Sequence, residues 1–368
     1  MRKRHINCLV SIAAATATGL GAAAVPASAH APVPAATARV HVVHPGQSIQ
    51  KAVNASKTGD TVLVLPGTYR ESVLITTTGL TLLGTGGRGR TVIMPATTTK
   101  AAKAANACAQ GGNGICVIGT AAHPVRDVHI RSLTVSGFKK NGIWASLTDG
   151  LTVRRVTTRA NGTWGIAQER STRGDFQHNI ATNNGDAGIF IANTVDTEGA
   201  ATDTFGTVIA SNILTGNRIG VTARRVRNMS IRDNTMTRNC SGVFVVGDES
   251  KPTAGAMTIS ENRIFENNKF CAATARLSAI QGSGIVLTGS EKTVVRSNLI
   301  RGNVGATPLS GGIVLFKSFV GALNTNNSVS DNEVMGNKPA DLANQDTTGT
   351  GNTFTRNRCG TSVPAGMC

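Results

Sequence analysis

The feature that most constrains the fold is a short apolar unit that recurs between two asparagines five residues apart. A second mark, a glycine followed by an aliphatic run, occurs at Gly142, Gly165 and Gly188, which lie 23 residues apart, and at Gly220 and Gly242, which lie 22 apart. A base period of about 22 residues with insertions indicates repeats that stack and share one core. The units are Asn212–Asn217, Asn234–Asn239, Asn262–Asn267, Asn298–Asn303, Asn332–Asn337 and Asn352–Asn357.

Each unit predicts three very short β-strands. Within 229–246, three short runs alternate apolar with polar residues, and bends that carry Asn or Gly separate them. Such alternation is typical of strands, whereas a helix would not tolerate so many Asn, Gly and Thr. No strand of this length buries its apolar side alone, so we expect successive units to stack about 4.8 Å apart.

The asparagines have two expected roles. Asn tolerates the left-handed backbone region better than other non-glycine residues, which suits a sharp bend. Stacked side-chain amides can also bond to one another as a ladder, which satisfies buried polar groups. The earlier units 128–138 and 151–161 carry aliphatic or aromatic residues at some ladder positions, so we expect the first coils to have more apolar corners.

The N-terminus has the pattern of a secretory signal. Residues 1–4 are rich in Arg and Lys, residues 9–25 are small and apolar, and Ala27-Ser28-Ala29 forms a cleavage motif. We therefore expect a signal peptide at 1–29, a flexible linker at 30–39 and one domain at 40–368, in a secreted, extracellular protein. The alternative, a membrane helix, has weakly hydrophobic Ala, Gly and Thr against it, and no later segment is apolar enough to span a bilayer.

Cysteine usage agrees with export. Cys8 leaves with the signal, and an even number of cysteines in an exported chain favours disulfides, although six thiols allow 15 pairings. Local proximity favours Cys108 with Cys116 and Cys359 with Cys368, which leaves Cys240 with Cys271. A metal site is the alternative, but the chain has neither a C-x-x-C motif nor a nearby His pair.

The chain is strongly basic, with a formal net charge of +17, or +14 once Arg2, Lys3 and Arg4 are removed. Such a surface attracts polyanions, which favours an acidic polysaccharide or cell-wall polymer as partner, although basic residues also serve solubility. An aromatic content of 4% and the lack of a basic run or stacking motif argue against specific nucleic-acid binding. We expect a monomer.

From about Val40 onward the chain resembles the right-handed parallel β-helix proteins of the pectate-lyase-like superfamily. The segments 46–53 and 59–71 are similar to the usual start of that fold. The resemblance implies an all-β, single-stranded solenoid with a short N-terminal capping helix. Ser48 is placed to N-cap that helix, whose Ile49, Ala52 and Val53 would plug the open end of the stack.

The resemblance does not extend to the known catalytic motifs. The segment 67–73 is similar to a motif of pectin methylesterases, whose later catalytic aspartate motifs are missing. The segment 184–189 resembles the N-x-D-D-x-I motif of polygalacturonases and carries over only Asp186, because Ala187 replaces the second carboxylate and no Gly-His-Gly occurs. The alginate epimerase D-P-H-S motif is also absent. Fold alone does not fix an activity.

The resemblance implies that the strand after each marked glycine forms the sugar-binding groove. Alternation then sends three aromatic side chains outward, Trp144, Phe190 and Phe244, and aromatic faces stack on sugar rings. The alternative is that the insertions after Phe190, Phe244 and Val314 fold back and cover this line. The full outward line is Trp144, Ala167, Phe190, Thr222, Phe244, Val286 and Val314.

The candidate catalytic residues are Asp186, Arg218 and Arg224, which we expect on neighbouring coils within about 10 Å. A polyuronate lyase needs a base beside the carboxylate and a cation to neutralise that carboxylate, although surface charge is the alternative role for each residue. The pair Asp248 and Glu249 is a candidate for Ca²⁺ without a firm site. Candidate substrate-binding residues are Trp144, Phe190, Phe244, Glu169 and Lys140.

These patterns support two hypotheses about function. The first is a carbohydrate-active protein that binds or acts on an acidic polysaccharide, with β-elimination by a polysaccharide lyase as the reaction. The second is a non-catalytic extracellular scaffold or glycan-binding protein that keeps the fold without the active site.

Overall fold

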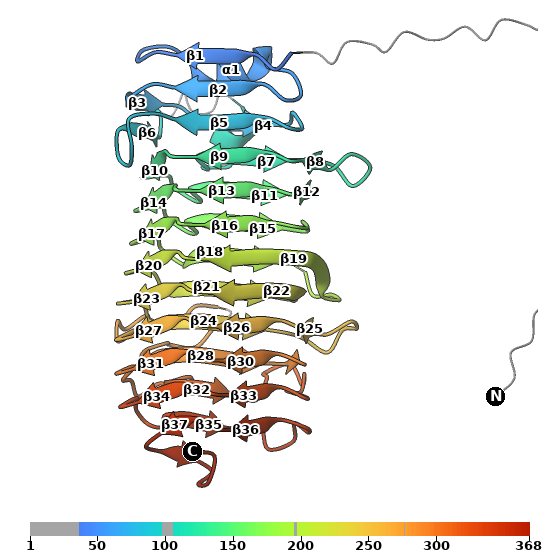
Figure 1. The fold of residues 1–368 in the computed structure, drawn as a ribbon, viewed down its shortest axis with the longest axis vertical. Helices are drawn as coiled ribbons and strands as arrows, with labels where there is room; N and C mark the ends of the chain where they lie inside the picture. Colours follow the sequence, from blue (N-terminus) through green and yellow to red (C-terminus); the bar gives the residue numbers. More distant parts are fainter. Residues whose placement is uncertain (1–36, 98–105, 195–196, 276) are drawn as a thin grey trace, which may run out of the picture. The chain divides into compact units, whose positions relative to one another are not determined.

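The computed structural model describes residues 37–97, 106–194, 197–275 and 277–368. From Val40 the chain winds through short strands that form three long parallel sheets (Figure 1). The fold is the expected right-handed parallel β-helix with three short strands per coil. The signal expected at 1–29 and most of the linker expected at 30–39 lie outside the described residues.

The three sheets, which we call A, B and C, take one strand each from a typical coil. Sheet A consists of β1 (Val40–Val43), β2 (Thr61–Val64), β5 (Thr81–Gly84), β9 (His129–Arg131), β13 (Thr152–Arg154), β16 (Asp175–Gln177), β19 (Thr202–Ala210), β22 (Val226–Arg232), β26 (Thr258–Ser260), β30 (Val294–Arg296), β33 (Ser328–Ser330) and β36 (Thr353–Thr355), with β25 (Ala254–Gly255) and β29 (Ser290–Glu291) beside it. Sheet B consists of β3 (Gly67–Arg70), β6 (Thr91–Met94), β10 (Thr134–Ser136), β14 (Thr157–Arg159), β17 (Ile180–Thr182), β20 (Ile213–Thr215), β23 (Thr235–Thr237), β27 (Arg263–Phe265), β31 (Leu299–Arg301), β34 (Glu333–Met335) and β37 (Arg358–Cys359). Sheet C consists of β4 (Val73–Ile75), β7 (Ile115–Ile118), β11 (Ile143–Ser146), β15 (Ile166–Glu169), β18 (Ala187–Ala192), β21 (Ile219–Arg224), β24 (Ser241–Val246), β28 (Ser283–Thr288), β32 (Gly311–Leu315), β35 (Leu342–Asn344) and β38 (Ser362–Val363). The strands β8 (Val125–Arg126) and β12 (Thr148–Asp149) form a separate pair, and the described helices are α1 (Ile49–Ala55) and α3 (Ala107–Gln110).

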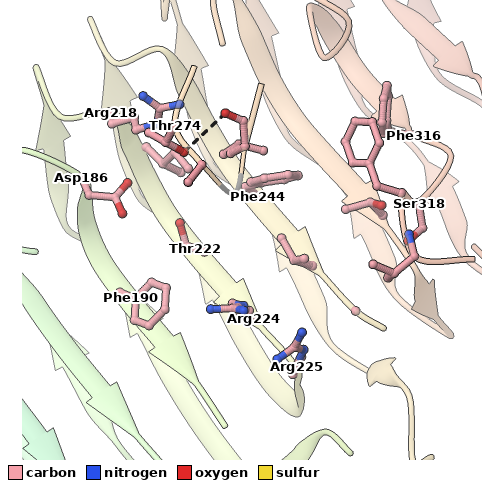
Figure 2. Close-up of a pocket in the computed structure, with 18 of the residues that line it drawn as sticks. Asp186, Phe190, Arg218, Thr222, Arg224, Arg225, Phe244, Thr274, Phe316 and Ser318 are labelled. Atoms are coloured by element: carbon pink, nitrogen blue, oxygen red, sulfur yellow. Dashed lines mark hydrogen bonds between the residues drawn. The ribbon is translucent and has the colours of Figure 1, made fainter. Parts of the chain in front are cut away.

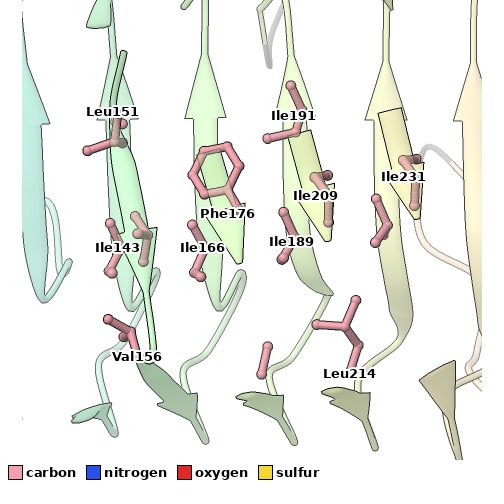
Figure 3. Packing of buried hydrophobic residues seen from close by; sticks show 14 of the residues in the cluster. Ile143, Leu151, Val156, Ile166, Phe176, Ile189, Ile191, Ile209, Leu214 and Ile231 are labelled. Carbon is pink, nitrogen blue, oxygen red and sulfur yellow. The ribbon is translucent and has the colours of Figure 1, made fainter. Parts of the chain in front are cut away.

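Successive coils stack in the register that the glycine alignment predicts. In sheet C, Ile143 pairs with Ile166, Ile166 with Ile189, and Ile189 with Val221. These side chains are fully buried and point into one continuous apolar core, which Figure 3 shows from close by. The strands are too short to be stable alone, so the shared core between coils supplies the burial that holds them.

The marked glycines are required by close backbone approach. A Cβ added to Gly142 would lie 2.6 Å from the carbonyl oxygen of Gly165 and 2.8 Å from the amide nitrogen of Asn161. The same approach repeats up the stack, since a Cβ at Gly165 would meet the carbonyl oxygen of Gly188 at 2.6 Å. Any side chain at this corner would push neighbouring coils apart, so glycine marks each coil for steric reasons.

The asparagines form ladders at two corners, as expected. At one corner the side-chain amide of Asn217 donates to Asn239 Oδ1 at 3.2 Å, and that of Asn239 donates to Asn267 Oδ1 at 2.9 Å. The backbone N–H of each residue donates to the same oxygen. The corresponding ladder at the other corner runs through Asn179, Asn212, Asn234, Asn262, Asn298, Asn332 and Asn357.

The expectation that Asn itself takes the left-handed conformation was wrong. The residue before the Asn has the positive φ, as in Asp233 (φ 55°) before Asn234 and Arg238 (φ 56°) before Asn239. The Asn is therefore selected for its side-chain amide, because its own position faces the next coil and needs both a donor and an acceptor. The residue at the bend varies, because the ladder uses the side chain of the Asn that follows it.

Two details of the ladders concern the ends of the stack. The last unit is offset from the others. Its second asparagine, Asn357, follows Asn332 in the ladder that the first asparagines of the other units form, and its first, Asn352, accepts from Asn327 at 3.0 Å. The first coils have apolar corners, as expected: the backbone N–H of Val156, which is itself buried in the core, donates to Asn179 Oδ1 at 3.0 Å.

The N-terminal end of the stack is closed by α1. The side chain of Ser48 accepts from the backbone of Lys51 at 3.2 Å, which confirms the predicted N-cap, and Ile49 and Val53 are buried in the core. The Glu71 carboxylate also accepts from the backbone of Ile49 at 2.7 Å and so stabilises the helix N-terminus. Within the described residues, no helix has the length and apolar character needed to cross a membrane.

The three disulfides have the predicted pairing. Cys108 bonds to Cys116, Cys240 to Cys271, and Cys359 to Cys368. The first and third close short local loops, whereas the second joins the start of a strand of sheet C to an insertion that lies over that sheet.

Candidate functional site

A cleft with a volume of about 760 Å³ lies on the outer face of sheet C, and Figure 2 shows the residues around it. Its floor comes from β18, β21 and β24. Three segments form its walls: residues 197–201 after β18, a small hairpin whose described residues are 271–275 and 277–280, and the loop 316–320. The cleft therefore exists because insertions in the 22-residue period rise around one face of an otherwise regular stack.

The floor consists of Phe190, Thr222 and Phe244, which are adjacent in register. Strand alternation sends them outward, because their neighbours Ile189 and Val221 point into the core. Phe190 and Phe244 are each only 5% exposed, so the floor presents little of its aromatic surface to solvent.

The rest of the expected outward line is covered. Ala167, Val286 and Val314 are buried in a second apolar cluster that also contains Phe316 from the loop 316–320, and Trp144 packs half-buried at its edge. The alternative that insertions fold back over this line is thus confirmed. The cleft is the part of the face that the insertions leave open.

Asp186 lies at one corner of the cleft, just before β18. The indole Nε1 of Trp164 donates to Asp186 Oδ2 at 3.2 Å, and the same indole stacks on Phe190 with ring centroids 4.1 Å apart and planes inclined by 7°. Burial raises the pKa of the Asp186 carboxyl above 3.8, while the Trp164 hydrogen bond and the Arg218 guanidinium oppose the rise. When ionised, this carboxyl is therefore a stronger base than an ordinary surface carboxylate.

Arg218 follows Asp186 by one coil step. Its backbone N–H donates to the Asp186 carbonyl at 3.0 Å, and its Nη1 donates to the Ala272 carbonyl at 2.8 Å. The Ala272 carbonyl belongs to the hairpin 271–280, which the Cys240–Cys271 disulfide joins to β24. The hairpin thus fixes a guanidinium beside Asp186.

Arg224 lies at the opposite corner of the cleft, at the end of β21. It lies six residue steps along an extended strand from Arg218, so their α-carbons are about 20 Å apart. The expected spacing of about 10 Å holds for Asp186 and Arg218 but was wrong for Arg224, because it counted coil steps and neglected the distance along the strand. The cleft consequently carries cations at two separate corners.

Sequence reasoning missed the ion pair that holds the wall beside Arg224. Arg225 Nε lies 2.5 Å from Asp248 Oδ2, and both side chains are at most 6% exposed. The same carboxylate accepts from the Gly199 backbone at 3.2 Å, which anchors residues 197–201. Asp248 was a candidate Ca²⁺ ligand, and in this structure its carboxylate contacts Arg225 and Gly199 instead. Among the described residues, no group of three His, Cys, Asp or Glu is arranged to hold a metal ion.

Three predicted binding residues lie outside the cleft lining. Glu169 is 9% exposed and forms an ion pair with Arg170 at 3.4 Å. It occupies the same position in its strand as Arg224, two coils earlier in sheet C. Lys140 is exposed in the bend before β11, and Trp144 is on β11 itself. Sequence reasoning missed Trp164, which stacks on Phe190 and donates to Asp186; its place directly before the marked Gly165 was the available signal.

Comparison with family models matches residues 200–366 to the family described as right handed beta helix region. This match agrees with the right-handed parallel β-helix that the three parallel sheets form. No curated protein sequence matches the chain.

Solved structures with a similar fold include three enzymes. The mannuronan C-5 epimerase AlgE4 A-module from Azotobacter vinelandii is 18% identical, with a TM-score of 0.54 over 86% of this chain and 91% of that one. DFA-IIIase from Arthrobacter chlorophenolicus A6, solved without its lid, is 15% identical, with a TM-score of 0.58 over 88% and 89%. The periplasmic alginate epimerase AlgG is 14% identical, with a TM-score of 0.51 over 88% and 73%. At these identities the likeness establishes the fold alone.

Proposed function

We propose that the cleft binds an acidic polysaccharide and that the Asp186–Arg218 corner acts on it by β-elimination. The observation that carries the proposal is the union, in one open cleft, of a carboxyl with a raised pKa, an adjacent fixed guanidinium and an aromatic floor. The names of two structural neighbours, a mannuronan epimerase and an alginate epimerase, point to the same class of polymer.

The chemistry follows from the two groups at this corner. Arg218 pairs with the carboxylate of a uronate residue and stabilises the negative charge that develops beside it. Ionised Asp186 removes the proton from the carbon next to that carboxylate. A double bond then forms to the neighbouring carbon, whose bond to the glycosidic oxygen breaks, and solvent supplies the proton to the leaving oxygen.

Arg224 has a binding role in this proposal. Its α-carbon is about 20 Å from that of Arg218, too far for both guanidinium groups to serve one sugar. It is placed instead to pair with the carboxylate of another residue of the same polymer. The nearly buried floor residues Phe190 and Phe244 shape the cleft between the two corners.

Binding and turnover can be measured separately. Oligomers of mannuronate, galacturonate and glycosaminoglycans are titrated against the protein while tryptophan fluorescence is followed, because Trp164 contacts Asp186 in the cleft. Absorbance in the unsaturated-uronate band, with and without Ca²⁺, reports elimination. We expect Arg224→Ala to weaken binding roughly tenfold, the loss of about one charge-assisted contact. Asp186→Asn should retain binding and form no unsaturated product.

Arg263→Ala is the matched control. Arg263 is exposed on β27 in sheet B, away from the cleft, and its substitution removes the same charge. Equal affinities for the Arg224→Ala and Arg263→Ala proteins would show that binding is general attraction to a basic surface. Binding without product from any polymer would reject elimination and leave a non-catalytic glycan-binding protein.

A further inference from the structure

One wall of the cleft is apolar, in contrast to the charged corners. The loop 316–320 contributes Phe316, Phe319 and Val320 to the lining, which also includes Phe244 and Leu277. Figure 2 shows Phe244 and Phe316. The rings of Phe316 and Phe319 pack against each other with centroids 5.2 Å apart. Phe316 also belongs to the buried cluster under the insertions, so it anchors the loop to the body of the stack.

The outer part of this wall is exposed to water. Phe319 is 72% exposed and Val320 is 44% exposed, although both line the cleft. The loop is nevertheless held at its base, because the side-chain amide of Asn324 donates to the Phe316 carbonyl at 2.9 Å. When an apolar group of a ligand covers such exposed, anchored side chains, apolar surface is removed from water, and this favours binding.

The register sets the spacing between this wall and the cationic corner. In sheet C, Arg224 pairs with Val246 on the next coil, and Val246 pairs with Thr288 on the coil after that. Because Leu287 pairs with Leu315, Phe316 lies one coil beyond Thr288. Three coil steps therefore separate Arg224 from Phe316, a distance of about 14 Å. A ligand that contacts both carries a carboxylate at one point and an apolar group a few sugar residues away.

We propose that the preferred ligand is an acidic polysaccharide that carries O-acyl groups, whose methyl or alkyl ends pack on Phe319 and Val320. This inference rests on the proposed function. Esterification of the carboxyl groups would also add methyl groups, but it would remove the charges that pair with Arg218 and Arg224. The charged corners and the apolar wall together favour acylation of hydroxyls over esterification of carboxyls.

The test compares three forms of one oligouronate: untreated, O-acetylated and methyl-esterified. We expect the acetylated form to bind about fourfold more tightly than the untreated form for each acetyl methyl that is buried, and the methyl ester to bind most weakly. In the double variant Phe319→Ser with Val320→Ser, the acetylated and untreated forms should bind equally, with unchanged affinity for the untreated form. Both positions are exposed, so the variant should fold.

Phe205→Ser is the matched control, because Phe205 is 62% exposed on β19 and does not line the cleft. It should keep the full preference for the acetylated form. Equal binding of the acetylated and untreated forms by the wild-type protein would overturn the acyl proposal and leave the proposed function standing. A preference that survives in the double variant, or a double variant that changes only the oligomeric state in sedimentation, would overturn it as well. Failure of the untreated oligomer to bind at all would instead reject the proposed function.

Discussion

At the scale of single residues, the proposed function depends on the ionisation of Asp186. Burial favours the neutral carboxyl, and Trp164 and Arg218 partly restore the charged form. A base whose pKa lies closer to the working pH is a more effective catalyst than an ordinary surface carboxylate, which is almost fully ionised but weakly basic. The stacked contact between Trp164 and Phe190 holds the indole that orients this carboxyl.

Asp186→Asn tests this raised pKa through stability. The folded chain binds the proton of Asp186 more tightly than the unfolded chain, so wild-type stability falls as pH rises from 3.8 through the folded-state pKa. The Asn variant keeps an acceptor oxygen for Trp164 and cannot ionise. We expect it to become more stable than the wild type over this pH range, and urea unfolding at a series of pH values measures the difference.

Asp331→Asn should show the opposite sign. A hydrogen bond from Arg356 lowers the pKa of Asp331, so the wild type gains stability from this group above 3.8 and loses it as pH falls through the folded-state pKa. The Asn variant should be the less stable protein at neutral pH, and the difference should vanish in acid.

Parallel stability curves for Asp186→Asn and the wild type would contradict a raised pKa at Asp186.

At the scale of elements, the hairpin that begins at Cys271 links a disulfide to the cleft residue Arg218. Its carbonyls at Ala272 and Ser278 accept from Arg218 at 2.8 and 3.4 Å, and its Cys271 is bonded to Cys240 at the start of β24. Backbone hydrogen bonds between Cys271 and Ile280 also hold the base of the hairpin. The disulfide therefore positions a guanidinium that belongs to a different coil.

Replacing both Cys240 and Cys271 with Ser should free the hairpin. The disulfide closes a sequence separation of 31 residues, which corresponds to a stabilisation of about 2 to 4 kcal/mol. We expect faster hydrogen exchange at 271–280 and several-fold weaker binding of acidic oligosaccharides, because Arg218 loses its fixed acceptors. The double Ser variant at Cys359 and Cys368 should bind normally. Unchanged binding in the Cys240 and Cys271 variant would show that the hairpin does not position Arg218.

The Asn ladder supports the corners on which the cleft depends. Asn239 is fully buried and accepts two N–H groups from Asn217, so Asn239→Ala leaves both without a partner. Each unpaired buried donor costs about 1 to 3 kcal/mol, and we expect a loss of roughly 2 to 5 kcal/mol in the free energy of unfolding. Asn54→Ala, at an exposed position of α1, should cost little. A loss below about 1 kcal/mol for Asn239→Ala would mean that water replaces the ladder.

The sequence predicted elements more accurately than it predicted the site. The repeated glycine and Asn pairs determine the register of sheet C, and that register placed Phe190 and Phe244 outward correctly. It could not predict the cleft walls, since the paths of 197–201 and 316–320 depend on distant contacts such as the one between Arg225 and Asp248. Arg224 was misplaced because coil spacing was considered without strand length.

At the scale of the whole molecule, the coils share one apolar core that runs from Val43 to Leu342. Each coil contacts mainly its two neighbours, so cooperativity depends on the interfaces between coils rather than on a central cluster. Phe176, on β16, is among the largest fully buried side chains and lies one coil before the strands that form the cleft floor. It is therefore a sensitive position at which to test whether the stack unfolds as one unit.

Phe176→Ala should weaken the stack at that point by about 3 to 5 kcal/mol, the usual cost of a truncated buried aromatic residue. Because coupling passes only between neighbouring coils, we expect the coils before Phe176 and those after it to unfold in separate steps. Calorimetry should resolve two transitions, and hydrogen exchange by segment should assign them. Phe354→Ala, near the C-terminal end, should lower protection only in the last coils. A single transition in Phe176→Ala, with protection lowered equally from β1 to β38, would show that the stack behaves as one cooperative body despite its linear construction.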